Sequence, residues 1–243
     1  MGQLDGKVVI VTGGGTGIGK GIAHAFAKEG ADLVLASRNG ANLEAAAAEL
    51  RSLGGRVLAV PTDVSDEAQV VALFERTMQE LGRLDILVNN SGSFGGGPLD
   101  ELTLETWQRS VDVNLTGPFL GTREAFKIMK RQGGGRIINI GSISAQMPRM
   151  NSAPYASTKH GLVGLTHSAA LEGRAHGIAV SCLHPGNVLS QMREDRDNPM
   201  NREPMMSVED IAAAALTMAT LPPHVNMYEA IVLPVDQVYL GRG

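Results

Sequence analysis

The sequence is poor in cysteine, in aromatic residues and in excess positive charge, and these shortages exclude several classes of protein. Its single cysteine, Cys182, cannot form an internal disulfide and suits a reducing compartment. Lysine and arginine number 21 against 25 acidic residues, so the net charge is -4. A chain with this balance offers no broad positive field to nucleic acid or to an anionic membrane, and we expect neither as a partner.

Long apolar runs are also missing. No stretch reaches the ~18 consecutive apolar residues of a membrane span, and the N-terminus lacks the basic and apolar stretches of a signal peptide. We therefore expect a cytoplasmic protein. The histidines form neither an H-E-x-x-H motif nor another close ligand set, so we expect no catalytic metal.

What the 243 residues do contain is an alternation of short apolar runs with longer amphipathic segments. The short runs have the pattern of strands buried on both faces of a parallel sheet; they are residues 8–11, 33–36, 57–60, 86–88, 137–140, 180–183 and 231–233. Helical spacing marks residues 18–29, 43–53, 67–81, 104–130, 153–176 and 208–221. The alternation predicts one α/β domain over residues 1–243, a doubly wound parallel sheet of Rossmann type with about seven strands and helices on both faces.

One stretch departs from this rhythm. Residues 191–206 are crowded with Arg, Asp, Asn, Pro and Met, and we interpret them as a surface lid, because loops beyond ~12 residues are often functional or disordered. Segments 93–98 and 143–154 are the other candidate walls of a substrate pocket. The apolar residues of the three segments are Phe94, Met147, Met150, Met192, Met200, Met205 and Met206. They favour a broad, moderately apolar carbonyl pocket, with methionines that merely fill loose loops as the alternative.

A glycine-rich turn follows the first expected strand and opens directly into a helix, reading Thr12-Gly13-Gly14-Gly15-Thr16-Gly17-Ile18-Gly19. Glycine lets a phosphate approach the backbone N–H groups and the dipole of the helix N-terminus. The nucleoside-triphosphate loop G-x-x-x-x-G-K-[ST] fits up to Lys20, but Gly21 lacks the hydroxyl that binds magnesium. The fingerprint G-x-G-x-x-G fails at Ile18. The turn alone does not decide between phosphate transfer and dinucleotide binding.

An ordered set of further motifs points to one family. After the turn, which reads T-G-x-x-x-G-x-G, come Asp63-Val64, Asn89-Asn90-Ser91-Gly92, Asn114, Ser142, Tyr155-x-x-x-Lys159 and Pro185-Gly186. Together they resemble the short-chain dehydrogenase/reductase family, in its short single-domain branch, over nearly the whole chain. The resemblance implies a hydride transfer between a nicotinamide and a ketone or secondary alcohol.

Tyr155 and Lys159 lie four residues apart on one expected helix and so share a face. A free phenol has a pKa of about 10, too high to accept a proton from an alcohol near neutrality, and a nearby ammonium favours the phenolate. Tyr155 can then act as general acid and base. Ser142 follows the fifth expected strand, where its hydroxyl can stabilise charge on the substrate oxygen. The resemblance adds that Lys159 holds the nicotinamide ribose and that Asn114 anchors a water.

The resemblance also bears on the cofactor. The family places an acidic residue after the second strand to bind the adenine ribose of NAD, but this chain has Ser37 and Arg38 there. A hydroxyl removes the repulsion against a 2′-phosphate, and a guanidinium is a charge-assisted partner for it. We therefore expect NADP(H) to be preferred over NAD(H); the alternative is a solvated arginine in an enzyme that tolerates NAD.

The remaining cofactor contacts follow from the same motifs. Asp63 and Val64 are expected to flank the adenine, although Asp63 could instead only help to start the next helix. Val188 is expected to offer backbone groups to the carboxamide. The full set of expected cofactor-binding residues is Gly13, Gly15, Thr16, Gly17, Ile18, Gly19, Ser37, Arg38, Asp63, Val64, Asn90, Gly92, Tyr155, Lys159, Pro185, Gly186, Val188 and Ser190.

Other readings of the sequence remain open at this point. A reductase of 3-oxoacyl thioesters, carried on acyl carrier protein or CoA, competes with an enzyme of free ketones and alcohols. A non-catalytic NADP(H)-binding sensor could keep the fold, but it would not need all four catalytic groups. The resemblance also implies a homodimer or homotetramer that associates through the helices bearing Asn114 and Tyr155.

Overall fold

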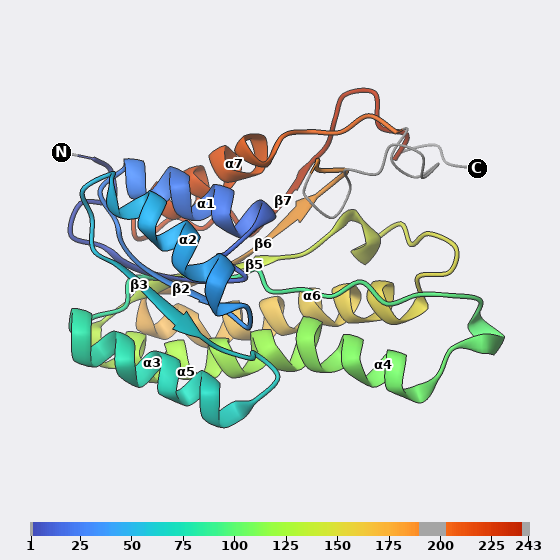
Figure 1. The fold of residues 1–243 in the computed structure, drawn as a ribbon, viewed down its shortest axis with the longest axis horizontal. Coiled ribbons are helices and arrows are strands. Elements are labelled where there is room, and N and C mark those ends of the chain that lie inside the picture. The colour runs from blue at the N-terminus through green and yellow to red at the C-terminus, as the bar shows by residue number, and fades with distance from the viewer. Residues whose placement is uncertain (1, 190–202, 240–243) are drawn as a thin grey trace.

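The computed structural model describes residues 2–189 and 203–239. Their central feature is a parallel seven-stranded sheet with the strand order β3-β2-β1-β4-β5-β6-β7. Helices cover both faces of this sheet (Figure 1). The chain runs outward from β1 to one edge, returns to the middle and continues to the other edge, which confirms the expected doubly wound α/β fold.

The elements alternate as the sequence predicts. The strands are β1 (Val8–Thr12), β2 (Asp32–Ser37), β3 (Val57–Pro61), β4 (Ile86–Asn89), β5 (Gly135–Ile140), β6 (Ile178–Pro185) and β7 (Glu229–Val232). The α-helices are α1 (Gly17–Lys28), α2 (Gly40–Arg51), α3 (Glu67–Leu81), α4 (Leu104–Val111), α5 (Gly117–Gln132), α6 (Ala153–Gly173) and α7 (Val208–Thr220). Short helical turns are η1 (Leu99–Glu101), η2 (Asp112–Thr116), η3 (Ile143–Ala145) and η4 (Arg174–His176). None of the helices in the described ranges is long and apolar enough to cross a membrane.

Most elements begin and end within three residues of their expected bounds, and two differences bear on the candidate site. The single helix expected over residues 104–130 is divided into α4 and α5 by the π-helical turn η2. The last strand begins at Glu229, two residues before the apolar run expected there. Glu229 pairs with Cys182 of β6, so sheet pairing rather than hydrophobicity sets the start of β7. Both differences lie beside residues of the candidate site.

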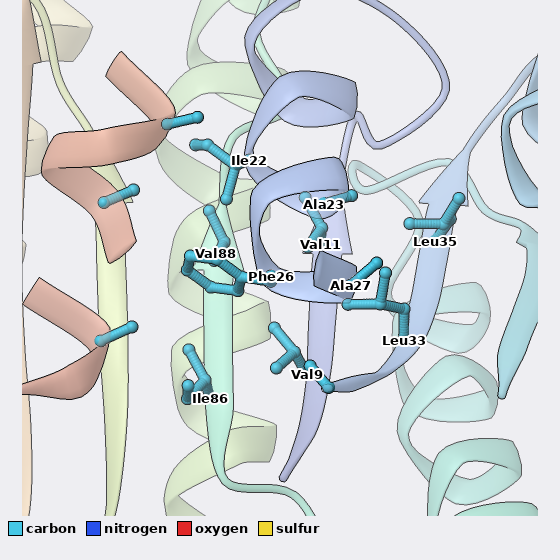
Figure 2. Close-up of a cluster of buried hydrophobic side chains, with 14 of the residues drawn as sticks. Val9, Val11, Ile22, Ala23, Phe26, Ala27, Leu33, Leu35, Ile86 and Val88 are labelled. Carbon is cyan, nitrogen blue, oxygen red and sulfur yellow. The ribbon is translucent and has the colours of Figure 1, made fainter. Parts of the chain in front are cut away.

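The inner strands of the sheet are buried on both faces, whereas the edge strands β3 and β7 are partly exposed. Helices α1, α2 and α7 contribute to the core cluster on one face, and α3, α5 and α6 to the cluster on the other. Figure 2 shows the first cluster, in which Phe26 and Ile22 of α1 lie over apolar side chains of β1 and β4. Phe26 is fully buried, and truncating such a phenylalanine to alanine typically costs ~3–5 kcal/mol. This packing makes the strands a rigid platform for the loops that follow them.

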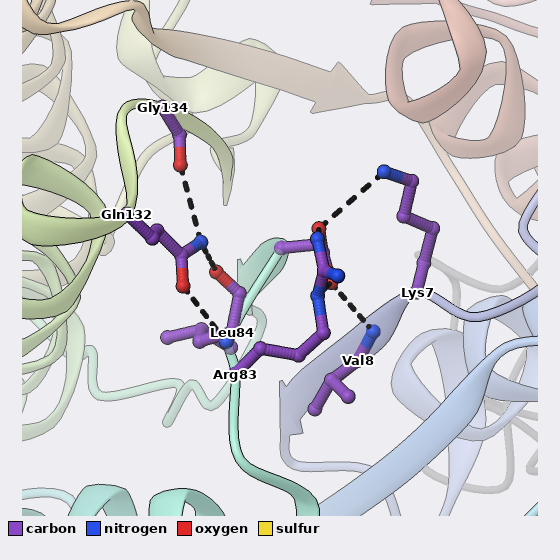
Figure 3. A network of polar contacts seen from close by, with 7 residues as sticks. Lys7, Val8, Arg83, Leu84, Gln132 and Gly134 are labelled. Atoms are coloured by element: carbon purple, nitrogen blue, oxygen red, sulfur yellow. Dashed lines mark hydrogen bonds and ion pairs between the residues drawn. The ribbon is translucent and has the colours of Figure 1, made fainter.

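A polar network holds the amino edge of the sheet (Figure 3). The Asp85 carboxylate accepts hydrogen bonds from the Val8 backbone N–H at 3.0 Å and from Arg83 Nε at 2.7 Å. Gln132 joins the same edge, because its Nε2 donates to the carbonyl oxygens of Leu84 and Gly134. The network links the starts of β1, β4 and β5 and leaves their carboxyl ends to the loops of the candidate site.

The only cysteine of the sequence, Cys182, is fully buried in β6. Burial raises the pKa of its thiol to about 12. We therefore expect a thiol-specific reagent at mildly alkaline pH to leave the folded protein unmodified and to label one cysteine after denaturation, because the thiolate is the reactive species. Rapid labelling of the folded protein would contradict this burial.

Candidate active site

The candidate site lies along the carboxyl edge of the sheet. Strands β1, β4, β5 and β6 end at Thr12, Asn89, Ile140 and Pro185, and all of them run in the same direction. Their following loops therefore meet at one edge, which is where open parallel sheets bind ligands. The glycine-rich turn, Ser142 and the Pro185-Gly186 turn are brought together in this way.

The turn after β1 has no room for side chains at two positions. Gly13 has a φ of 66°, and a Cβ there would lie 2.7 Å from Nδ2 of Asn90. A Cβ on Gly19 would lie 2.3 Å from the Gly13 carbonyl oxygen. Thr16, at the N-cap of α1, makes no side-chain capping bond, so the first N–H groups of the helix keep their capacity to bind an anion.

Lys20 does not serve the turn as it would in a triphosphate loop. Its Nζ lies 2.7 Å from Glu49 Oε2 on α2, in an exposed ion pair. With Gly21 in place of the magnesium-binding hydroxyl, two of the groups that a phosphate-transfer site requires are absent from this turn. The arrangement favours a dinucleotide over a triphosphate.

Thr12 is a site residue that the predicted contacts did not include, although it begins the motif. Its hydroxyl donates to the Val88 carbonyl oxygen at 3.3 Å and accepts from the backbone N–H groups of Asn90 and Ser91 at 2.9 and 3.0 Å. The Asn90 side chain returns a hydrogen bond to the Thr12 carbonyl oxygen at 2.9 Å. These bonds join the loop after β4 to the glycine turn.

A pocket of about 250 Å³ adjoins the turn. The predicted residues that line it are Gly13, Gly15, Thr16, Ser37, Arg38, Asp63, Val64 and Gly92, and it is also lined by Asn39, Asn42, Thr62, Ser91 and Val113. A second pocket, of about 380 Å³, lies beside α6 and the segment before β7 and contains none of the predicted site residues. Despite its smaller volume, the pocket at the glycine-rich turn is the candidate cofactor site, because the turn, the ends of the strands and several polar side chains meet there.

Asp63 has two roles in this pocket. Its carboxylate accepts hydrogen bonds from the Ser65 hydroxyl at 2.6 Å and the Ser65 N–H at 3.0 Å, and these bonds, followed by the nearby charge of Arg38, hold its pKa below the usual range. The N-cap of α3 is Asp66, which accepts from the Gln69 N–H at 3.2 Å. Asp63 thus shapes the turn before α3 while lining the pocket.

Lys159 and Tyr155 lie on α6 at the edge of the sheet. The lysine side chain is buried, and its Nζ donates to the Ile140 carbonyl oxygen at 2.8 Å, at the end of β5. The same Nζ lies 5.6 Å from the centre of the Tyr155 ring. The Phe94 ring covers the phenol from the loop after β4, with ring centres 5.4 Å apart and planes tilted by 49°. The structure thus brings the Phe94 ring and the Tyr155 ring together.

Ser142 lies two residues after Ile140, the last residue of β5, and is the N-cap of η3. Its Oγ accepts a hydrogen bond from the Ser144 N–H at 3.1 Å, and the residue is buried. Its backbone contacts His184 of β6, a residue that the sequence did not single out. The His184 ring is fully buried, and burial lowers its pKa below the ordinary value of 6.5.

Asn114 lies in the π-helical turn η2, whose interruption of the helix was not predicted. Its Oδ1 accepts from the Ser93 N–H at 2.8 Å, and its Nδ2 donates to the Ser93 carbonyl oxygen at 2.8 Å. Nδ2 also lies 3.3 Å from the Thr158 hydroxyl on α6. A single side chain therefore links η2, the loop after β4 and the helix of Tyr155, and π-turns are frequent at functional sites.

The turn after β6 is held by the C-terminal part of the chain. The Gly186 N–H donates to the Val232 carbonyl oxygen at 2.8 Å, and the Asn187 N–H donates to Gln237 Oε1 at 2.9 Å.

Val188, which follows this turn, pairs with Met206. Met206 is buried among core residues near α1 and α7, so its expected place in the substrate wall is wrong. Predicted Ser190 and lid residues 191–202 lie outside the described residues.

Within residues 2–189 and 203–239, no group of three or more His, Cys, Asp or Glu side chains is placed to hold a metal ion. The polar groups of the candidate site are instead hydroxyls, amides, backbone groups, the Lys159 ammonium, the Arg38 guanidinium and the Asp63 carboxylate. Such groups can bind a nucleotide and move a proton.

Many known proteins are similar to this chain in sequence or in structure. The family model described as short chain dehydrogenase matches residues 7–201. The chain is 37% identical to glucose 1-dehydrogenase 2 of Bacillus subtilis, over 88% of this chain and 87% of that protein, and 34% identical to 3-oxoacyl-[acyl-carrier-protein] reductase of a Synechocystis strain, over 91% and 92%. A crystal structure of 3-ketoacyl-(acyl-carrier-protein) reductase from Brucella melitensis, complexed with NADH, superposes with a TM-score of 0.85 at 32% identity and covers 95% of this chain and 98% of that one.

Proposed function

The chain belongs to the short-chain dehydrogenase family, and from this premise we propose that it is an NADP(H)-dependent oxidoreductase with Tyr155 as its general acid and base. Its substrates are ketones and the corresponding secondary alcohols. The observation that carries the proposal is the buried ammonium of Lys159, fixed to the Ile140 carbonyl oxygen with its Nζ 5.6 Å from the Tyr155 ring centre.

The proposed chemistry follows from the charges of these groups. The bound nicotinamide supplies the hydride in reduction and accepts it in oxidation. Tyr155 donates the proton that the substrate oxygen takes up in reduction, and the adjacent positive charge of Lys159 stabilises the phenolate left behind. An ammonium has three N–H donors, so the bond to Ile140 leaves two for the tyrosine side and the cofactor ribose. Burial of Lys159 keeps this charge effective, because water screens it little.

Ser142 and Asn114 complete the proposed set. The Ser142 hydroxyl is assigned the hydrogen bond to the substrate oxygen, where negative charge develops as the hydride arrives. Asn114 is assigned the water through which Lys159 exchanges protons with solvent, as the family resemblance implies. Its two bonds to Ser93 support the assignment, because they fix the local backbone of η2 beside α6.

The residues present suit a dinucleotide phosphate. The side-chain-free turn at Gly13 and Gly19 fits a pyrophosphate against the start of α1. Ser37 and Arg38 line the same pocket after β2, where a hydroxyl and a guanidinium favour the 2′-phosphate of NADP(H) over the free ribose of NAD(H). Val64 and Gly92 are assigned to the adenine and its linkage, and Val188 to the carboxamide.

The comparisons support two substrate classes within this function. The Synechocystis and Brucella relatives act on 3-oxoacyl groups of acyl carrier protein, and the Bacillus relative on glucose. A panel of ketones, 3-oxoacyl thioesters, glucose, polyols and hydroxy acids, assayed for consumption of NADPH or formation of NADPH from NADP⁺, distinguishes them. We expect turnover on at least one member. Tight NADPH binding with no turnover on any member would replace the proposal with a sensor.

Ser142→Ala tests the assigned oxyanion donor. We expect kcat to fall about a hundred-fold while the Kd for NADPH stays unchanged, because a preorganised donor contributes mainly in the transition state. Stopped-flow turnover and fluorescence titration of NADPH measure the two quantities. Ser157→Ala, on the exposed side of α6, serves as the matched control and should behave as wild type. An unchanged kcat in Ser142→Ala would remove Ser142 from the mechanism.

We also propose that the protein is a homodimer or homotetramer. Large apolar side chains are exposed on α4 and α5: Leu104 is 78% exposed, Trp107 39% and Phe119 46%. These helices flank η2 and lie beside α6, in line with the association that the family resemblance implies. Light scattering should give the mass of a dimer or tetramer, and a monomer at micromolar concentration would contradict the proposal.

A further inference from the structure

The buried His184 ring touches both polar groups of the Ser142 backbone. Its Nδ1 lies 3.0 Å from the Ser142 carbonyl oxygen and 3.3 Å from the Ser142 amide nitrogen. Gly141 makes room for the ring, because a Cβ there would lie 2.5 Å from the same Nδ1. The imidazole of β6 is therefore packed against the backbone that carries the Ser142 hydroxyl.

Glu229 lies on the other side of the ring. His184 Nε2 is 3.0 Å from Glu229 Oε1, outside hydrogen-bonding geometry but close enough for a strong electrostatic interaction. The carboxylate favours a proton on Nε2, because the bare lone pair would face a negative charge. Nδ1 then decides the contact with Ser142: without a proton it accepts from the amide N–H, and with a proton it donates to the carbonyl oxygen.

These contacts assign a role to His184, which belongs to none of the sequence motifs of the family. Building on the proposed function, we infer that His184 is a positioning residue, whose neutral ring holds the Ser142 backbone so that the hydroxyl faces the substrate oxygen, with Glu229 fixing the tautomer. With a second proton on the ring, Nδ1 donates to the Ser142 carbonyl oxygen, 3.0 Å away, and the Ser142 amide N–H loses its acceptor. Ser142 is the N-cap of η3, so this change of backbone partner also acts on the residue whose hydroxyl accepts from the Ser144 N–H.

The charged groups around the ring set the direction of the pH effect. Burial and the nearby Lys159 charge lower the His184 pKa, whereas Glu229 and the Ser142 carbonyl raise it, and the net pKa lies below 6.5. Cys182 faces the same space but stays neutral, since its thiol pKa is about 12. Around Glu229 lie His167, at 3.9 Å, and Gln146, which donates to it at 3.2 Å and is in turn bonded by the Tyr239 hydroxyl.

The ring is thus neutral at pH 7 and gains its second proton only on acidification below 6.5. We expect kcat for carbonyl reduction to decline on this acid side. The unfolded chain binds that proton more readily than the folded chain, so the free energy of unfolding also decreases as the pH falls through this range.

The test compares kcat against pH, at saturating NADPH and carbonyl substrate, in four variants. His184→Asn retains a hydrogen-bonding amide near the Nδ1 position without a titrating group; its kcat at pH 7 should stay within about three-fold of wild type, and the acid decline should disappear. His184→Leu should lower kcat about ten- to a hundred-fold with the Kd for NADPH unchanged, as expected when a buried backbone group loses its partner. Glu229→Gln should move the decline to lower pH. His176→Asn, in exposed η4, is the control.

An acid decline in His184→Asn that matches wild type would overturn the inference, as would a wild-type profile with no decline. Should His184→Leu not fold, His184→Asn and Glu229→Gln still decide the question. Tyr155→Phe, measured in the same series, separates this inference from the function on which it rests. An inactive Tyr155→Phe protein with an unaltered His184→Asn profile removes only the positioning role, whereas a fully active Tyr155→Phe protein removes the proposed function itself.

Discussion

Tyr155→Phe is expected to lower kcat by about a thousand-fold or more, since the phenol is the proposed proton donor and a positioned general acid contributes 10²–10⁴-fold. The Kd for NADPH should change little, because the substitution removes one oxygen and leaves the ring against Phe94, 5.4 Å away. Stopped-flow measurement of NADPH consumption gives kcat, and fluorescence titration gives the Kd. The combination separates a lost chemical step from a lost cofactor site.

Tyr228→Phe is the matched control for this substitution. Tyr228 is 42% exposed and stacks on His167 at a ring-centre distance of 4.9 Å, outside the proposed machinery. Removal of its hydroxyl should leave kcat unchanged. A Tyr155→Phe protein as active as the Tyr228→Phe protein would show that another group supplies the proton.

Arg38→Asp is expected to reverse the cofactor preference. The ratio of kcat/KM for NADPH to that for NADH should fall by about a hundred-fold or more, because a charge-assisted bond to the 2′-phosphate is replaced by repulsion. The new carboxylate can also accept from the hydroxyls of the NADH ribose. Steady-state kinetics with both cofactors and one carbonyl substrate give the ratio.

An arginine outside the pocket provides the control. Arg76 is exposed on α3, so Arg76→Asp imposes the same change of charge without altering the pocket. The ratio of kcat/KM for NADPH to that for NADH in Arg76→Asp should match that of the wild type. A ratio that is as high in Arg38→Asp as in Arg76→Asp would show that Arg38 does not select the cofactor.

The sheet was predictable because its signal is local. Strands buried on both faces are mostly apolar, and the apolar runs in β1 and β2 are continuous, so the sequence predicts these strands directly. Strand β7 was placed two residues late, since its first residue, Glu229, is polar and is recruited by pairing with Cys182. The π-turn at Asn114 was also missed, because residues 112–116 continue the helical spacing of the segments on either side of them.

The candidate site was predictable where spacing carries the chemistry. Four residues separate Tyr155 from Lys159 on α6, and the glycine turn is contiguous. Contacts between residues that are far apart in the sequence leave no such pattern in it. His184 lies 42 positions from Ser142, and within its apolar strand it has no pattern that distinguishes a functional ring from a packed one. Met206 was assigned to the pocket by composition alone, whereas its pairing with Val188 directs it into the core.

The central claim is that a hydride passes between the nicotinamide of NADP(H) and a carbonyl carbon. Its most direct test uses NADPH in which deuterium replaces both hydrogens at C4 of the nicotinamide ring, with a carbonyl compound that the enzyme reduces, and analysis of the alcohol by mass spectrometry. We predict one deuterium on the carbinol carbon of the wild-type product, and no product above background with Tyr155→Phe. An alcohol that contains no deuterium, or cofactor binding without any alcohol, would contradict the account.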